Sequence, residues 1–92
     1  MYNIAEYSYD QAKKLNVMIQ PSEKGHYKID VFSNDGNYIT SIGNKYYNDY
    51  PAYILKNGLD YANTRRRLYK KRHEKDRHII GSRGYYSDKI LW

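Results

Sequence analysis

The chain has 92 residues, a formal net charge of +6 and no cysteine. A chain of this length supports a single domain with a small core, so we expect one domain over residues 1–92. The lack of cysteine excludes disulfides and thiolate metal sites. No apolar run approaches the ~20 residues that span a bilayer, and the first residues lack the pattern of a secretory signal. Composition therefore predicts a soluble intracellular protein with no membrane partner.

The first predicted element is a short helix over residues 9–15. Residues 8–11 fit a capping box, in which the Ser8 hydroxyl accepts from the backbone N–H of Gln11 and the Gln11 side chain reaches back. Residues 15–20 then predict a strand, which Pro21 and the polar loop behind it end.

Residues 27–42 predict a β-hairpin. The Asp35-Gly36 pair is typical of a two-residue type I′ turn, because both central residues of that turn need a positive φ. This turn would pair Ile29 with Ile42, Val31 with Thr40, Ser33 with Tyr38, Phe32 with Ile39, and Asp30 with Ser41. The predicted core face carries Tyr27, Ile29, Val31, Tyr38 and Ile42. With the preceding strand added, residues 16–42 form a three-stranded antiparallel meander.

Residues 51–77 predict a helical region. Pro51 favours a first helical turn with Asp49 or Tyr50 as its cap, and the short helix should end at Gly58. A long helix is then expected from Leu59 to about Arg77.

Residues 78–92 are predicted to be a docked C-terminal tail, because their last positions are too apolar to stay in solvent. The expected fold is α+β, with the meander packed against one long basic helix and short helices flanking it.

The positive charge is concentrated between residues 65 and 78, where eight lysines and arginines stand against two acids. At about 100° per residue, Tyr61, Ala62, Leu68 and Tyr69 fall in one arc, which we expect to face the sheet. The opposite face carries Arg66, Arg67, Lys70, Lys71, Lys75 and Arg77. This excess of cations predicts a surface for a polyanion, with Arg83 as a further phosphate contact. The alternative is an ordinary solvated face.

Arg65 and Arg72 fall inside the apolar arc, where an unpaired charge is costly. One interpretation is structural: Asp76, four residues after Arg72, or Asp30, Asp49 and Asp88 from elsewhere pair with them. The other is a small anion pocket at the seam between helix and sheet, which would hold a phosphate.

Signals for catalysis are weak. His73-Glu74 begins like the zinc-protease motif His-Glu-x-x-His, but the position of the second histidine is Arg77. Asp30, Asp49 and Asp76 could be assembled for metal-dependent nucleolysis, although any chain supplies this many carboxylates. We expect no enzyme activity, no metal site and no cofactor.

Residues 65–73 and 84–92 carry the patterns Arg-Arg-x-Leu-Tyr-x-x-Arg-His and Gly-Tyr-Tyr-x-Asp-Lys-x-Leu-Trp. These patterns resemble a family of small uncharacterised proteins of nucleocytoplasmic giant DNA viruses, and the likeness covers residues 27–92. The resemblance implies a viral protein in the cytoplasm or nucleus of an infected cell, with packaging into the virion as an option. It implies no activity.

We expect a non-catalytic nucleic-acid-binding protein that contacts backbone phosphates through the basic helix 59–77, with little sequence specificity and with DNA preferred over RNA. One alternative is a virion structural or capsid-associated protein, whose basic helix and Tyr and Trp surfaces contact acidic viral proteins. A second alternative is a small nuclease or a nuclease accessory factor. The thirteen tyrosines suit either a thin core or contacts with bases.

Overall fold

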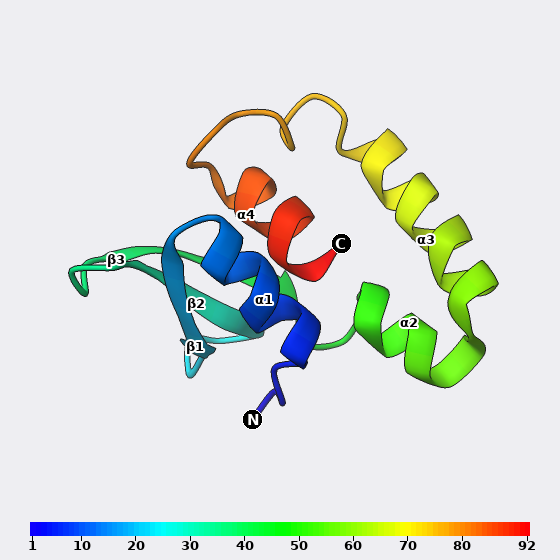
Figure 1. Ribbon diagram of the computed structural model, residues 1–92, viewed down its shortest axis with the longest axis horizontal. Helices are drawn as coiled ribbons and strands as arrows, with labels where there is room; N and C mark the ends of the chain where they lie inside the picture. The colour runs from blue at the N-terminus through cyan, green and yellow to red at the C-terminus, as the bar shows by residue number, and fades with distance from the viewer.

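The computed structural model describes residues 1–92 and combines a small sheet with four helices (Figure 1). In chain order the elements are α1 (Glu6–Lys14), β1 (Val17–Pro21), β2 (Tyr27–Ser33), β3 (Tyr38–Asn44), α2 (Tyr50–Asn57), α3 (Leu59–Arg72) and α4 (Arg83–Leu91). The sheet is antiparallel with the strand order β1-β2-β3. The predicted α+β class and three-stranded meander are confirmed, and none of the helices is both long and apolar enough to cross a membrane.

The β2–β3 hairpin has the predicted register over most of its length. Ile29 pairs with Ile42 and Val31 with Thr40, but the register then shifts, so that Phe32 faces Tyr38 instead of Ile39. Gly36 has a φ of 89°, whereas Asp35 does not have a positive φ, so the predicted type I′ turn is wrong. A three-residue loop that ends in a left-handed glycine replaces it. Because of the shift, Tyr38 leaves the expected core face and is 47% exposed.

Local signals set the bounds of α2. The Asp49 side chain accepts a hydrogen bond from the backbone N–H of Ala52 at 3.1 Å, and Pro51 occupies the first turn. Gly58 ends the helix with a φ of 88°. Both features were predicted, because a cap and a left-handed glycine act within a few residues of the chain.

The predicted capping box at the start of α1 is wrong. The helix begins at Glu6, and its N-cap residue, Ala5, supplies no side-chain hydrogen bond. Ser8 is instead buried and donates to the carbonyl of Ile90 at 2.9 Å, while the Gln11 amide donates to the carbonyl of Lys89 at 3.1 Å. Both side chains thereby satisfy carbonyls in the last turn of α4, which have no partner inside that helix.

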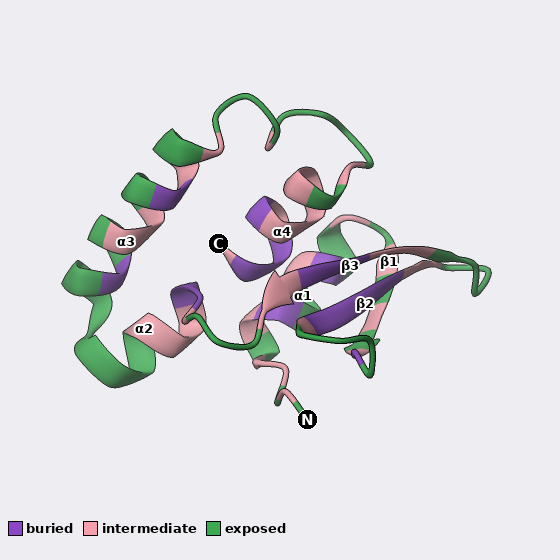
Figure 2. Cartoon of the chain, turned by 180° about the vertical axis from the view of Figure 1, so that it is seen from behind, coloured by how far each residue is buried: buried purple, intermediate pink, exposed green.

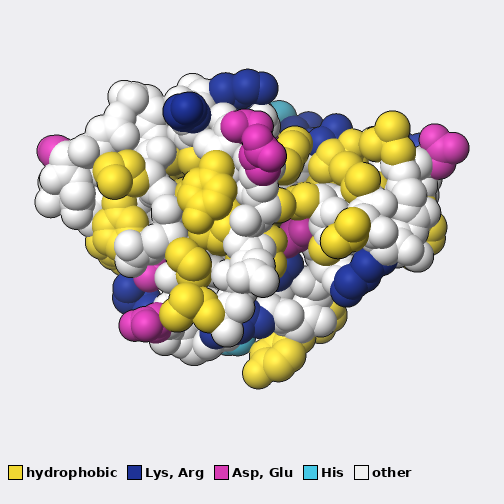
Figure 3. All heavy atoms as spheres, turned by 60° about the horizontal axis from the view of Figure 1, so that its bottom comes forward, with side chains coloured by type: hydrophobic (Ala, Val, Ile, Leu, Met, Phe, Trp, Pro, Cys, Tyr) yellow, Lys and Arg dark blue, Asp and Glu magenta, His cyan; other side chains and the backbone are white.

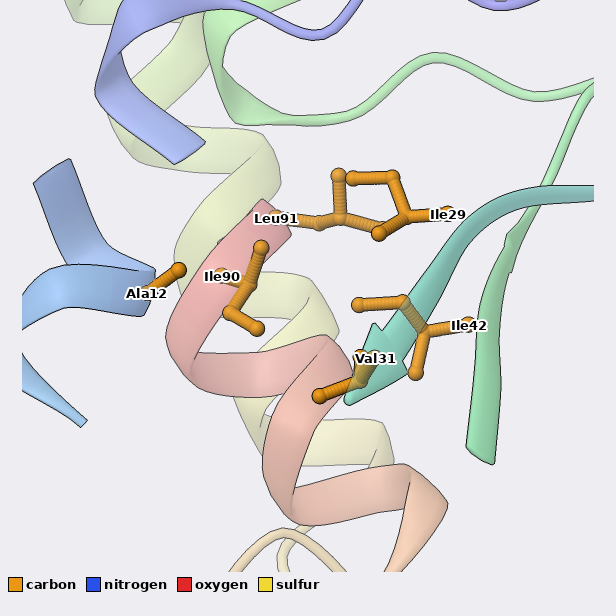
Figure 4. Packing of buried hydrophobic residues seen from close by; sticks show 6 residues of the cluster. All are labelled: Ala12, Ile29, Val31, Ile42, Ile90 and Leu91. Atoms are coloured by element: carbon orange, nitrogen blue, oxygen red, sulfur yellow. The ribbon is translucent and has the colours of Figure 1, made fainter. Parts of the chain in front are cut away.

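The C-terminal segment is a helix in the core, where a docked tail was expected. Ser82 caps α4 by accepting from the N–H of Tyr85 at 3.1 Å. Ile90 and Leu91 are almost completely buried (Figure 4). They pack in one cluster with Ala12, Ile29, Val31 and Ile42. Full burial of such a side chain contributes about 1.5–3 kcal/mol, so these two residues anchor α4 on the sheet.

Helix α3 lies outside α4 and packs mainly on α2 (Figure 1). The prediction that the long basic helix covers the sheet is therefore corrected: α1 and α4 do so. Only Ala62 and Tyr69 of α3 are buried, and most of its length is exposed (Figure 2). The helix also ends at Arg72 rather than at Arg77, and turns lead from there to α4.

Candidate nucleic-acid interface

The packed side of α3 differs from the predicted one. Ala62 is fully buried, and Tyr69 stacks on Trp92 with ring centroids 4.4 Å apart and an interplanar angle of 9°. Tyr61 and Leu68, expected on this side, are 46% and 40% exposed. At about 100° per residue, the centre of the buried side is turned by roughly 50° from the centre of the expected arc.

Arg66 consequently lies on the inner side of the helix. Its Nε donates to the Trp92 carbonyl at 2.7 Å, and its Nη2 donates to the Tyr7 hydroxyl at 3.0 Å. The guanidinium also lies 3.5 Å from the centroid of the Tyr50 ring. Burial raises the pKa of the Tyr7 phenol, and the charge of Arg66 opposes that rise. Arg66 therefore connects three elements of the fold and is unsuited to phosphate contact.

Asp88 engages two more of the predicted outer cations. This carboxylate is fully buried and lies 2.8 Å from the Lys70 Nζ and 3.7 Å from Arg77 Nη1. Cationic partners are needed here, because an unpaired buried charge costs several kcal/mol. Arg83 is also occupied: its Nε donates to the Ser41 carbonyl at 2.9 Å, and its guanidinium lies over the Tyr27 ring. The expected outer face of cations is therefore smaller than predicted, because Arg66, Lys70 and Arg77 have partners inside the fold.

Five basic residues of the segment form no ion pair and no hydrogen bond within the protein. We call these the unpaired cations: Arg65, Arg67, Lys71, Arg72 and Lys75. All are exposed to solvent, Arg65 only in part. The expected ion pair between Arg72 and Asp76 is not formed. Asp76 Oδ1 instead lies 3.5 Å from His73 Nδ1.

Glu74 is the other acid of this segment. It hydrogen-bonds with His78 and Arg77, and these contacts, His78 first, lower the pKa of its carboxyl. Neither acid of the segment neutralises an unpaired cation.

A cavity of about 500 Å³ opens below the edge of α3 that carries Arg65 and Arg72. It lies at the seam between α3, the end of α4 and the sheet, where the anion pocket was considered. Tyr47, Tyr53 and Trp92 contribute aromatic walls. Sequence reasoning missed these rings, because they come from the loop after β3, from α2 and from the residue that follows α4, which only the tertiary fold brings together. The seven-residue spacing of Arg65 and Arg72 was the one available signal.

Asp49 is the only acidic side chain that lines this cavity. It is buried, lies 2.8 Å from the Lys28 Nζ and accepts a hydrogen bond from the Tyr2 hydroxyl. The charges of Lys28 and Asp49 cancel, so Arg65 and Arg72 give the side chains that line the cavity a net positive charge.

The carboxylates considered for metal-dependent nucleolysis are not brought together. Asp30 accepts from the Ser41 hydroxyl at 2.6 Å, Asp49 pairs with Lys28, and Asp76 pairs with His73. No group of three or more His, Asp or Glu side chains has the arrangement of a metal site.

Comparison of the chain with protein-family models, with curated proteins and with solved structures found no match. The resemblance to the giant-virus family stays a prediction, and a function has to be argued from the geometry of the site.

Proposed function

We propose that this protein is a non-catalytic nucleic-acid-binding protein that contacts backbone phosphates through the unpaired cations. The observation that carries the proposal is that these five side chains, all between residues 65 and 75, have no carboxylate partner in the fold. Lysines and arginines clustered in this way bind polyanions by releasing condensed counterions.

The rest of the molecule does not cancel the field of this cluster. Residues 1–64 hold six lysines against seven acids, which makes them nearly neutral. A basic cluster on a neutral body attracts a polyanion to one side of the protein and orients it during encounter.

Little sequence specificity is expected from this surface. Only two neutral polar side chains lie beside the cations on this helix, and each already makes one hydrogen bond: Asn63 accepts from the Tyr50 hydroxyl at 2.8 Å, and Thr64 donates to the Asp60 carbonyl at 3.2 Å. The five cations outnumber these polar groups, so contacts to phosphates dominate over contacts to base edges.

The test is a set of electrophoretic shift titrations with duplex DNA, single-stranded DNA and RNA at several salt concentrations. Each phosphate contact contributes about 0.9 to the log–log salt slope on duplex DNA, so the triple variant Arg67→Gln/Lys71→Gln/Lys75→Gln should lower the slope by about 3. DNA is the polymer expected to bind.

The matched control is Lys13→Gln/Lys14→Gln/Lys45→Gln. It removes the same charge from exposed positions on α1 and the loop after β3. We expect the control to keep the wild-type slope. Equal slopes for the two triple variants would contradict the proposal.

A second candidate is a structural protein that uses apolar contacts. Leu55 is 88% exposed and Tyr46 82% exposed. Figure 3 shows hydrophobic side chains in several groups spread across one face, with cations around and between them. Trp92, expected in such contacts, instead stacks on Tyr69. Self-association or shell assembly in size-exclusion chromatography, lost in Leu55→Asp, would favour this candidate.

A further inference from the structure

We propose that the cavity beside α3 accepts one nucleotide of a single-stranded nucleic acid, with its phosphate at Arg65 and Arg72 and its base against the aromatic wall. This inference rests on the proposed function and names the polymer as single-stranded rather than duplex.

The phosphate subsite follows from two arginines on one edge of α3. Arg65 and Arg72 are seven residues apart, which is about two helical turns, so both face the cavity. The Arg65 guanidinium lies over the Tyr53 ring, 5.4 Å from its centroid. Arg72 forms no ion pair and no side-chain hydrogen bond within the protein. Two guanidinium groups without carboxylate partners, beside a concave space, suit an anion with several acceptor oxygens.

Electrostatics in the cavity favour the same ligand. Asp49 is not a counterion of Arg65 or Arg72, because its oxygens already contact the Lys28 ammonium, the Tyr2 hydroxyl and the backbone N–H of Ala52 at the start of α2. A phosphate would therefore be the missing counterion of this space.

The base subsite follows from a row of rings. Tyr69 stacks on Trp92, and Trp92 lies 6.1 Å from Tyr53 between ring centroids. Tyr47, at the cavity wall, is 72% exposed and can close over a planar ligand. Bases stack on such rings without strong sequence preference, in agreement with phosphate-dominated binding.

Two amides complete the site. Asn44 and Asn48 line the cavity, and only their carbonyl oxygens accept hydrogen bonds in the fold, from Tyr46 and Lys56. Their amide N–H groups stay available to the carbonyl oxygens of a base.

Size and access explain why the strand should be single. A volume of about 500 Å³ falls in the range of small-molecule sites, about 300–1,000 Å³, and can hold one nucleotide. A base in a duplex is paired and stacked, and it would have to be flipped out before it could enter.

Trp92 is the only tryptophan of the chain and lines the cavity, so its fluorescence reports on occupancy. The full chain is titrated with a deoxythymidine oligonucleotide, with its duplex of equal length, and with thymidine monophosphate and inorganic phosphate. We expect the oligonucleotide to quench Trp92 and to bind about tenfold tighter than the duplex.

Two matched pairs of variants locate the site. Arg72→Gln should remove the preference for the single strand, whereas Arg67→Gln, which lies outside the cavity on the same helix, should weaken both polymers equally. Tyr47→Ala should weaken single-strand binding about tenfold, whereas Tyr46→Ala should leave it unchanged. Both tyrosines are mostly exposed, so neither variant disturbs the fold.

The outcomes separate this inference from the proposed function. Equal binding of single strand and duplex, with unchanged Trp92 emission, overturns the inference and leaves the proposed function intact. Failure of every polymer to bind overturns the proposed function. Quenching by thymidine monophosphate alone assigns the cavity to a free nucleotide and overturns the single-strand inference.

Discussion

Neighbouring cations on the two sides of α3 have different environments. Lys70 lies 2.8 Å from the buried carboxylate of Asp88, whereas Lys71 is exposed and makes no ion pair. Arg66 contacts Trp92, Tyr7 and Tyr50, whereas Arg67 contacts solvent. The number of cations in a segment therefore exceeds the number available to bind a ligand, because the cations on the inner side of the helix already contact other parts of the fold. These two neighbouring pairs allow the difference to be measured with matched substitutions.

The largest difference is expected between Lys70→Ala and Lys71→Ala. The first leaves Asp88 buried without its nearest cation and should lower the free energy of unfolding by about 3 kcal/mol. The second should change it by less than about 0.5 kcal/mol, as for an ordinary surface substitution, while weakening DNA binding. Urea unfolding followed by circular dichroism measures the stabilities. Equal stability of the two variants would show that Lys70 is a surface cation.

Arg66→Ala against Arg67→Ala should give the next largest difference. Arg66→Ala removes two hydrogen bonds and the contact with the Tyr50 ring, which together contribute about 2 kcal/mol to stability. Arg67→Ala should keep the stability of the wild type and lose affinity for DNA. Thermal unfolding and shift titrations on the same preparations separate the two effects, and a reversed order would contradict the assigned orientation of α3.

Alkaline pH should weaken the fold through its partly buried tyrosines. Burial raises the pKa of the phenols of Tyr2, Tyr7 and Tyr69 above the ordinary value of 10.0. A group whose pKa is raised in the folded state stabilises that state below its ordinary pKa, and this stability is lost as the pH rises further. The melting temperature should therefore fall as the pH rises above about 10. Tyr2→Phe should flatten the fall, and an unchanged profile would mean that this phenol is not protected.

The predictions that succeeded depend on short stretches of chain. The alternation in residues 27–42 predicted the hairpin and most of its register, and Asp49, Pro51 and Gly58 predicted the bounds of α2. The turn itself was wrong, because an Asp-Gly pair also fits a three-residue loop in which Gly36 alone has a positive φ. The local sequence therefore limits the turn to a few types but does not select one of them.

The candidate site was predicted only in part. Charge counting found the segment that holds the unpaired cations, yet it also included Arg66, Lys70, Arg77 and Arg83, which the fold uses internally. Arg65 and Arg72 were recognised as unusual, and the anion pocket was one of two interpretations. The aromatic walls were not foreseen, since Tyr47 and Trp92 are far apart in the sequence and meet only at the cavity.

Sequence alone was enough for the α+β class, the order of strands and the location of the charge, because periodicity, turn residues and composition are read directly from neighbouring positions. Tertiary structure decided which helix covers the sheet and which side of α3 faces inward. The physical reason is that α4 supplies two fully buried aliphatic side chains, Ile90 and Leu91, to the core cluster, whereas the buried residues of α3, Ala62 and Tyr69, are not part of that cluster. Asp88 and Trp92 of that segment then turn Lys70 and Arg66 inward and leave Arg67 and Lys71 to solvent.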